Sequence, residues 1–121
     1  MPVEEWKYIT GFEGRYMVSN WGRVKRVNHV SPAGKPLDYM MMKLCVHDTG
    51  YHVIYLGNGR DKVKLFLHRL VAIHFIDNPE DKEQVNHLDK VRTNNTIENL
   101  EWTTVAENAH HRDNYDPDEP F

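Results

Sequence analysis

The spacing of apolar and polar residues divides this 121-residue chain into segments with different periods. Between residues 4 and 27 apolar and polar positions alternate, most clearly in the second half, and Asn20 and Gly22 interrupt the alternation. A period of two is typical of a strand with one buried face, and Asn and Gly favour tight turns. The segment therefore predicts a short β-hairpin. The following SPAGKPLDY, residues 31–39, predicts a loop.

Residues 41–67 contain runs of β-branched and aromatic residues that are interrupted by DTG and by GNGR. Gly and Asn tolerate positive φ, so both interruptions predict hairpin turns. The pattern favours three strands, near residues 41–47, 51–56 and 62–67, joined as an antiparallel meander.

The period changes in LHRLVAIHF, which begins at residue 67. Its helically spaced positions are Leu67, Leu70, Val71, His74 and Phe75. They predict a short amphipathic helix that covers the meander. DNPED should end this helix, because Pro79 cannot continue it.

The last patterned segment covers residues 84–111. QVNHLD predicts a short strand, KVRTNNT a loop and IENLEWT a second short strand. Thr104 and Glu107 have the S/T-x-x-E spacing of a capping box, so we expect a helix to begin there and to continue through AENAHHR. This order brings His87 at the first strand, Asn99 at the second and Asn108 on the helix to one side of the unit.

Composition places the chain among ordinary globular proteins, with 40% hydrophobic and 27% charged residues. No apolar run approaches the roughly 20 residues that cross a bilayer. The acidic start MPVEEWKY lacks the plan of a signal peptide, and the single Cys45 excludes an intramolecular disulfide and a multi-cysteine zinc site. We therefore expect a cytoplasmic domain with no membrane partner.

Charge is distributed unevenly around the net value of −3. Residues 1–76 hold 11 Lys and Arg against 6 Asp and Glu, a net charge of +5. Residues 77–121 hold 4 against 12, a net charge of −8, so that the two parts together give −3. The asymmetry indicates a basic portion that binds a polyanion such as a nucleic acid, and an acidic portion with another role.

The motifs VNHLD, NN, ENLEW and EN of the last segment resemble the signature of HNH endonucleases of the phage and intron homing type. HRLVAIHF and the following Asn-Pro loop are similar to what precedes the signature in that family. Residues 4–27 resemble a small N-terminal motif often fused to such nucleases. Together these likenesses cover most of residues 4–111 and imply metal-dependent DNA cleavage that leaves a 5′ phosphate and a 3′ hydroxyl.

The resemblance also implies an architecture. It is an α+β fold with a small antiparallel β-meander and a covering helix, followed by a ββα-metal (His-Me finger) nuclease unit. The expected division is a nuclease-associated β-hairpin motif at 1–30, a DNA-contacting meander and helix at 31–78, the HNH unit at 79–113 and an acidic tail at 114–121. The family further suggests a phage or mobile-element origin, hence the host cytoplasm.

Roles follow from the resemblance position by position. His87 matches the general base, and a neutral imidazole with a pKa of about 6.5 can take a proton from water. Asn108 matches one protein ligand of a single Mg²⁺ (or Mn²⁺) ion, and Asn86 matches the other. Relatives often have Asp or His there, so Asn86 predicts weak metal affinity, and Asp89 is an alternative carboxylate. Asn99 matches the central Asn, which is expected to hydrogen-bond across the hairpin loop and orient His87.

Basic side chains upstream of the signature are the predicted phosphate contacts. Lys62 and Lys64 alternate with Val63 and Leu65, which places both lysines on one face of a strand. Phosphate contacts position DNA but do not specify its sequence, so no target is predicted. A solvated sheet face is the alternative for these residues. The set is Arg23, Lys25, Arg26, Lys43, Arg60, Lys62, Lys64 and Arg69.

Two other functions stay open at this level. One is a DNA-binding module whose nuclease site has decayed, which would bind DNA with a steep salt dependence and without turnover. The other is a zinc protein that uses His87, His110 and His111. Whether the chain acts alone, as a homodimer or with another partner is open as well.

Several conspicuous residues have an ordinary structural interpretation. Asn94, Asn95 and Thr96 are typical turn formers. Trp102 is expected to pack in the core and to hold the second strand beneath the helix. His68, at the start of the helix, either caps or packs there or takes part in the reaction.

Overall fold

The computed structural model describes residues 3–30, 34, 36–58 and 61–107. This part of the chain forms antiparallel sheets around one α-helix. The strands are β1 (Trp6–Tyr8), β2 (Tyr16–Ser19), β3 (Val24–Val30), β4 (Pro36–Met41), β5 (Cys45–Val46), β6 (His52–Asn58), β7 (Asp61–Phe66), β8 (Gln84–His87) and β9 (Leu100–Thr103). The helices are α1 (Leu67–Phe75) and the short 3₁₀ helix η1 (Ile97–Asn99).

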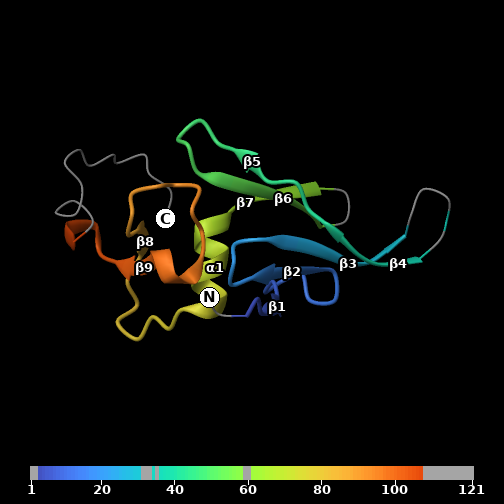
Figure 1. The fold of residues 1–121 in the computed structure, drawn as a ribbon, viewed down its shortest axis with the longest axis horizontal. Coiled ribbons are helices and arrows are strands. Elements are labelled where there is room, and N and C mark those ends of the chain that lie inside the picture. Colours follow the sequence, from blue (N-terminus) through green and yellow to red (C-terminus); the bar gives the residue numbers. More distant parts are fainter. Residues whose placement is uncertain (1–2, 31–33, 35, 59–60, 108–121) are drawn as a thin grey trace.

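Three sheets are arranged around α1. The sheets are β1-β2-β3-β4, β5-β6-β7 and the hairpin β8-β9, and every strand pair is antiparallel. Figure 1 shows α1 in the middle, with the β8-β9 hairpin on one side and the two larger sheets on the other. The β3–β4 pair extends away from this centre as an arm. The expected α+β class with a meander, a covering helix and a final hairpin is confirmed.

The turn that the sequence predicted at Asn20 and Gly22 is present and joins β2 to β3. Gly22 has a φ of 82°, and its N–H donates to the Ser19 carbonyl over 3.0 Å. The Asn20 side chain accepts from the Glu5 N–H (2.7 Å) and donates to the Val3 carbonyl (3.1 Å). The β2–β3 turn is therefore tied to the strand segment that precedes it.

The structure corrects several strand and loop predictions. The predicted strand IENLEWT begins only at Leu100, because Ile97–Asn99 form η1, so Asn99 lies just before the strand. The expected loop at 31–39 ends early, because β4 begins at Pro36 and pairs with β3, with Val27 opposite Tyr39. Proline is tolerated at the first residue of a strand and on a sheet edge, so it did not break this strand. The expected strand at 41–47 is reduced to Cys45–Val46, since residue 41 already belongs to β4. Residues 31–33 and 35 lie outside the described part.

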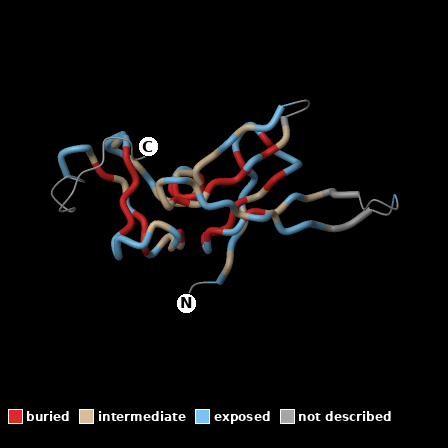
Figure 2. The backbone as a smooth tube through the Cα atoms, turned by 90° about the horizontal axis from the view of Figure 1, so that it is seen from above, coloured by how far each residue is buried: buried red, intermediate tan, exposed pale blue. Residues whose placement is uncertain are grey.

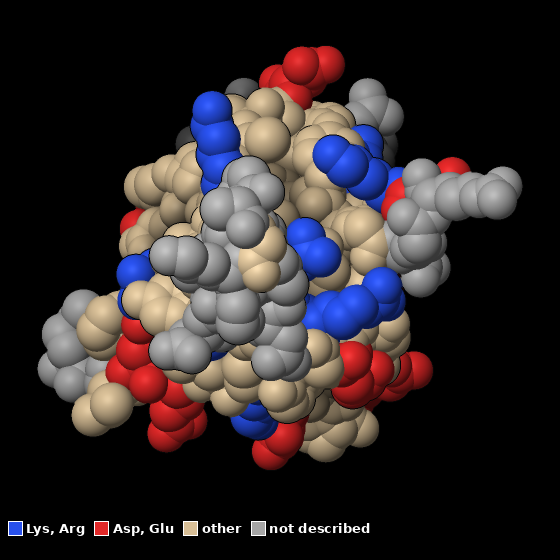
Figure 3. Space-filling view, turned by 90° about the vertical axis from the view of Figure 1, so that its right-hand side faces the viewer, with Lys and Arg blue, Asp and Glu red and all other residues tan. Residues whose placement is uncertain are grey.

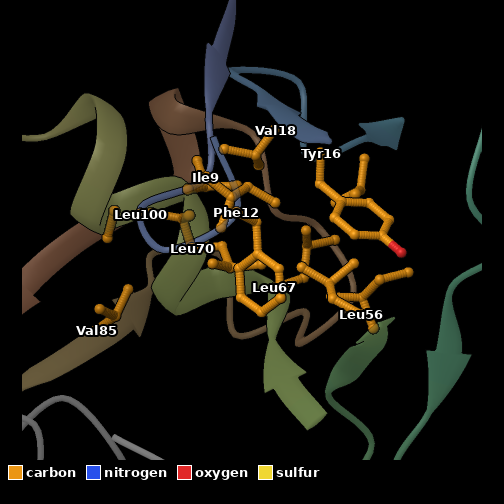
Figure 4. Packing of buried hydrophobic residues seen from close by; sticks show 13 residues of the cluster. Ile9, Phe12, Tyr16, Val18, Leu56, Leu67, Leu70, Val85 and Leu100 are labelled. Atoms are coloured by element: carbon orange, nitrogen blue, oxygen red, sulfur yellow. The ribbon is translucent and has the colours of Figure 1, made fainter. Parts of the chain in front are cut away.

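The core forms where α1 meets all three sheets. Figure 4 shows Leu67 and Leu70 of α1 among side chains from the sheets, with Val85 and Leu100 of the hairpin at one end. Each fully buried side chain of this size contributes about 1.5–3 kcal/mol. In Figure 2 the buried segments lie in the centre and along the hairpin. On the β3–β4 arm, Arg26, Tyr39 and Met40 are exposed. One helix thus fixes the hairpin relative to the other sheets.

The predicted bounds and face of α1 are confirmed. Leu67, Leu70 and Val71 are buried and Ile73 is half exposed. Trp102 packs against the core from β9, and its indole N–H donates to the Ile76 carbonyl over 2.9 Å, as its core assignment required. Within the described ranges, no helix has the length and apolar character to cross a membrane.

Candidate active site

The hairpin register determines where His87 and Asn86 point. His87 is the last residue of β8 and lies opposite Leu100, whereas Asn86 lies opposite Glu101. Successive strand side chains leave opposite faces, so His87 shares the α1 side with Val85, and Asn86 shares the other side with Glu101. His87 and Asn86 are both 4% exposed.

Two aromatic side chains stand beside the His87 ring. Its centroid lies 5.3 Å from that of His68 and 5.7 Å from that of Tyr51, and Tyr51 and His68 stack at 4.8 Å. His68 is buried in the first turn of α1, whose N-cap residue is Phe66, so His68 packs and does not cap. These two stacked rings pack against one side of the imidazole.

A buried amide holds the His87 ring. The distance from His87 Nε2 to Asn95 Oδ1 is 2.7 Å. An amide oxygen can only accept, so Nε2 donates, and the lone pair of the neutral ring is on Nδ1. Asn95 is 4% exposed. Sequence reasoning took Asn95 for a turn residue and missed this contact, because nothing in the local pattern distinguishes it from Asn94.

Asn99 braces the loop that follows His87. Its Oδ1 accepts from the Asp89 N–H (3.0 Å), and its Nδ2 donates to Asp89 Oδ1 and to the Asn94 carbonyl (both 2.8 Å). Its carbonyl accepts from the Leu88 N–H over 2.8 Å. The expected hydrogen bonds across the hairpin loop are present. The further idea that they orient His87 stays a prediction.

Asp89, the alternative carboxylate ligand, accepts hydrogen bonds from other residues of the loop. Its Oδ1 also accepts from the Val91 N–H and its Oδ2 from Asn94 Nδ2, both over 2.8 Å. The hydrogen bond from Asn94, followed by that from the Val91 backbone, lowers the pKa of Asp89 below its usual 3.8. Its oxygens are therefore used to hold the loop shape.

This pKa predicts an acid-sensitive loop. A carboxyl with a lowered folded-state pKa stabilises the protein above its unfolded pKa of 3.8, and that contribution is lost as the pH falls through the folded value. We expect Asp89→Asn to be less stable than the unsubstituted protein at pH 7 and the gap to close towards pH 2. Thermal unfolding midpoints across this range measure it. Asp61→Asn, at an exposed position, is the matched control. If the difference in unfolding midpoint between Asp89→Asn and the unsubstituted protein does not change with pH, the prediction is contradicted.

The opposite face of the hairpin offers oxygen ligands. Asn86 Nδ2 donates to Glu101 Oε1 over 3.0 Å, which directs the amide nitrogen towards the carboxylate. Glu101 is exposed. Amide and carboxylate oxygens are ligands that Mg²⁺ prefers, so these residues fit a hard divalent cation. Among the described residues, no three His, Cys, Asp or Glu side chains are grouped to hold a metal. Asn108, His110 and His111 lie outside the described residues.

The predicted capping box is confirmed. Glu107 N donates to Thr104 Oγ1 (3.1 Å), and Thr104 N donates to Glu107 Oε1 (3.0 Å). Residues 105–107 are helical, and Lys82 bridges to Glu107 over 3.1 Å. The start of the final helix is therefore fixed to the segment before β8.

The predicted phosphate contacts lie on more than one face. Lys62 and Lys64 are exposed, and the intervening Val63 packs against the core, as the alternation required. Arg23 and Lys25 both lie over the Trp6 ring, at 5.7 and 4.1 Å from its centroid, so they share one face of the first sheet.

Other members of the predicted set have partners within the protein. Arg23 forms an ion pair with Glu4. Arg69 donates to the Glu83 carbonyl over 2.9 Å and lies over the Trp102 ring, and burial lowers its pKa. Arg26 and Lys43 are exposed, and Arg60 lies outside the described residues. Viewed from the end of the arm, Lys and Arg spread over the face, and most Asp and Glu gather along its lower rim (Figure 3).

Comparisons with known proteins match both parts of the chain. Residues 4–57 match the NUMOD4 motif, and residues 65–110 match an HNH endonuclease family. The DNA endonuclease I-HmuI of Bacillus phage SP01 is 40% identical over 105 residues, which cover 87% of this chain and 55% of that protein. The uncharacterized HNH endonuclease L245 of Acanthamoeba polyphaga mimivirus is 38% identical over 109 residues, 90% of this chain and 30% of that protein.

A solved structure is also similar. It describes DNA binding and cleavage by the HNH homing endonuclease I-HmuI, with a TM-score of 0.73 and 39% identity. The match covers 88% of this chain and 56% of that one. The chain thus spans about half the length of the phage relative and about a third of the viral one.

Proposed function

Since the chain belongs to the HNH endonucleases and carries a NUMOD4 motif ahead of its HNH domain, we propose that it hydrolyses phosphodiester bonds in DNA. The observation that carries the proposal is the end of β8. There a buried histidine is held through Nε2, and an amide–carboxylate pair lies on the opposite face of the same strand end. This arrangement supplies a base at His87 and oxygen ligands at Asn86 and Glu101.

His87 performs the proton step. Nδ1 takes a proton from a water molecule as the water oxygen attacks phosphorus, and the bond from phosphorus to the 3′ oxygen breaks. The 3′ oxygen leaves with the electron pair of that bond and takes a proton from solvent water. Asn95 Oδ1 continues to accept from Nε2–H and stabilises the imidazolium that forms. Tyr51 and His68 limit the ring's rotation.

HNH endonucleases generally use a divalent metal, and here we propose Mg²⁺ or Mn²⁺. Asn86 and Asn108 would hold the ion, with the Glu101 carboxylate adding negative charge next to Asn86. When bound, such a cation neutralises charge on the phosphate and on the leaving oxygen. Asn86 and His87 leave β8 on opposite faces. We therefore place the scissile phosphate beyond the strand end, where the chain turns and the Lys90 N–H donates to the His87 carbonyl.

The amide–carboxylate pair predicts how metal affinity responds to charge. Glu101→Gln removes the negative charge and should weaken Mn²⁺ binding about tenfold. Asn86→Asp supplies a carboxylate at the ligand position and should strengthen it by a similar factor. Calorimetric titration of the free protein with Mn²⁺ measures both. Glu98→Gln, exposed in η1, is the control, and equal affinities for all variants would refute the assignment.

DNA binding should depend on Lys62 and Lys64. Each phosphate contact that is lost reduces the slope of log K against log salt concentration by about 0.9. Lys62→Ala with Lys64→Ala should therefore lower the slope by about 1.8, measured by fluorescence anisotropy on a labelled duplex. Lys82→Ala, whose ammonium group pairs with Glu80 and Glu107, is the matched control. If the double variant has the same salt slope as Lys82→Ala, Lys62 and Lys64 do not contact DNA and form a solvated sheet face.

Nicking of supercoiled plasmid tests the activity. With Mg²⁺ or Mn²⁺ the protein should convert the plasmid to open-circle or linear form, and a chelator should stop it. Binding of duplex DNA without any nicking would favour the second candidate, a DNA-binding module with an inactive site. That candidate is motivated by Asn86, which replaces the Asp or His that relatives often have.

A further inference from the structure

The loop that holds His87 is itself held by the first sheet. Asn95, whose amide accepts from the His87 ring, lies next to the β2–β3 turn of the NUMOD4 motif. Two residues further on, the Ile97 N–H donates to the Asn20 carbonyl over 3.0 Å. Asn20 is 3% exposed, and its side chain is hydrogen-bonded to Val3 and Glu5. The turn is therefore a firm support.

Gly22 makes the closest approach of the turn to this loop. A Cβ added at Gly22 would lie 2.8 Å from the Asn95 carbonyl oxygen and 3.0 Å from the Asn95 Cβ. Distances under 3.0 Å require something to move, and the nearest atom here is backbone. A side chain at position 22 therefore requires either the β2–β3 turn or Asn95 to shift. Because the turn is anchored through Asn20, we expect the shift at Asn95, the residue that holds the His87 imidazole.

The second sheet clamps the same loop from another side. The Arg92 guanidinium donates to the Thr49 carbonyl in the β5–β6 turn and lies over the Tyr51 ring, 4.9 Å from its centroid. Tyr51 in turn contacts the His87 ring. The loop of residues 88–99 is thus fixed between the turns of two sheets.

We propose that the β2–β3 turn of the NUMOD4 motif is a positioning element for the general base, acting from Gly22 through Asn95 to His87. This inference rests on the proposed function of His87. It gives the N-terminal motif a role besides any contact with DNA: it selects the ring nitrogen that carries the proton. Because a positioning error of about 1 Å can lower a rate about 100-fold, the turn contributes to catalysis without touching the substrate.

A pair of glycine variants isolates the contact. Gly22 and Gly14 have nearly the same positive φ, 82° and 81°. A Cβ at Gly14 meets nothing within 4 Å, whereas one at Gly22 meets Asn95. Gly14→Ala therefore reproduces the backbone strain alone. Gly22→Ala adds the push on Asn95.

The decisive readout is the tautomer of His87 in the DNA-free protein, from long-range ¹H–¹⁵N NMR at pH 8. We expect the Nε2–H form in the unsubstituted protein, in Gly14→Ala and in Asn95→Asp, which keeps an acceptor. We expect a mixture of tautomers in Gly22→Ala and Asn95→Ala. If Gly22→Ala keeps the tautomer of Gly14→Ala, the proposal is overturned.

Single-turnover nicking gives the second readout. Gly22→Ala should cleave about 10- to 100-fold more slowly than Gly14→Ala while binding duplex DNA equally well. Equal nicking rates for these two variants would also overturn the proposal. If the unsubstituted protein never nicks but the tautomers differ as expected, the positioning stands and the nuclease function fails.

Discussion

His87→Ala is expected to abolish nicking of supercoiled plasmid in Mg²⁺ or Mn²⁺ and to leave DNA affinity nearly unchanged. A positioned general base contributes about 10²- to 10⁴-fold, and Ala cannot take the proton from water. The ring contributes no charge to DNA binding when it is neutral. Single-turnover rates and anisotropy titrations of the same preparation separate the two effects.

The matched control is His52→Ala. His52 lies on β6 with intermediate exposure, and burial lowers its pKa. This variant should nick at the rate of the unsubstituted protein. A His87→Ala protein that still nicks within a fewfold of His52→Ala would remove His87 from the reaction.

Asn99→Ala is expected to lower both stability and rate. It removes the hydrogen bonds to the Asp89 N–H and the Asn94 carbonyl, and each hydrogen bond of this kind contributes about 0.5–1.5 kcal/mol. The loop after His87 should loosen, and the nicking rate should fall about 100-fold. Thermal unfolding and single-turnover nicking measure the two losses.

Asn99→Asp tests the contact between Asn99 Nδ2 and Asp89 Oδ1 separately. It keeps the oxygen that accepts from the Asp89 N–H but places a carboxylate where Asn99 Nδ2 now donates to Asp89 Oδ1. Like charges this close raise the pKa of the pair, so the variant should be less stable than Asn99→Ala at pH 8 and recover as the pH falls. If Asn99→Asp and Asn99→Ala have equal stability at pH 8 and at lower pH, the Asn99–Asp89 contact is unimportant.

Local patterns predicted the elements whose signals are short-range. The helical spacing gave Leu67–Phe75 correctly, and the S/T-x-x-E spacing gave the cap at Thr104. Both signals depend on neighbours within one or two turns. The β4 strand was missed because its partner lies across the arm. Pairing with β3 outweighed the proline and glycine that indicated a loop.

The candidate site was predicted in part. The strand pattern placed His87 on the first strand of the hairpin, and the motif resemblance predicted the loop hydrogen bonds of Asn99. The geometry agrees on both. Asn95 could not be distinguished from other turn asparagines, because its role depends on burial against the β2–β3 turn 75 residues earlier in the sequence. Glu101 was missed for a similar reason, since only the strand register places it opposite Asn86. The metal and catalytic roles stay predictions.

The most direct test of the account is where a paramagnetic ion binds. In the ¹⁵N-labelled protein bound to a non-cleavable duplex, substoichiometric Mn²⁺ should broaden the signals of residues 86, 87, 101 and 108 before all others. That result would place the cation and the imidazole of His87 at the same end of β8. Broadening centred on the acidic segment around residues 77–83, with residues 86 and 87 unaffected, would contradict the account.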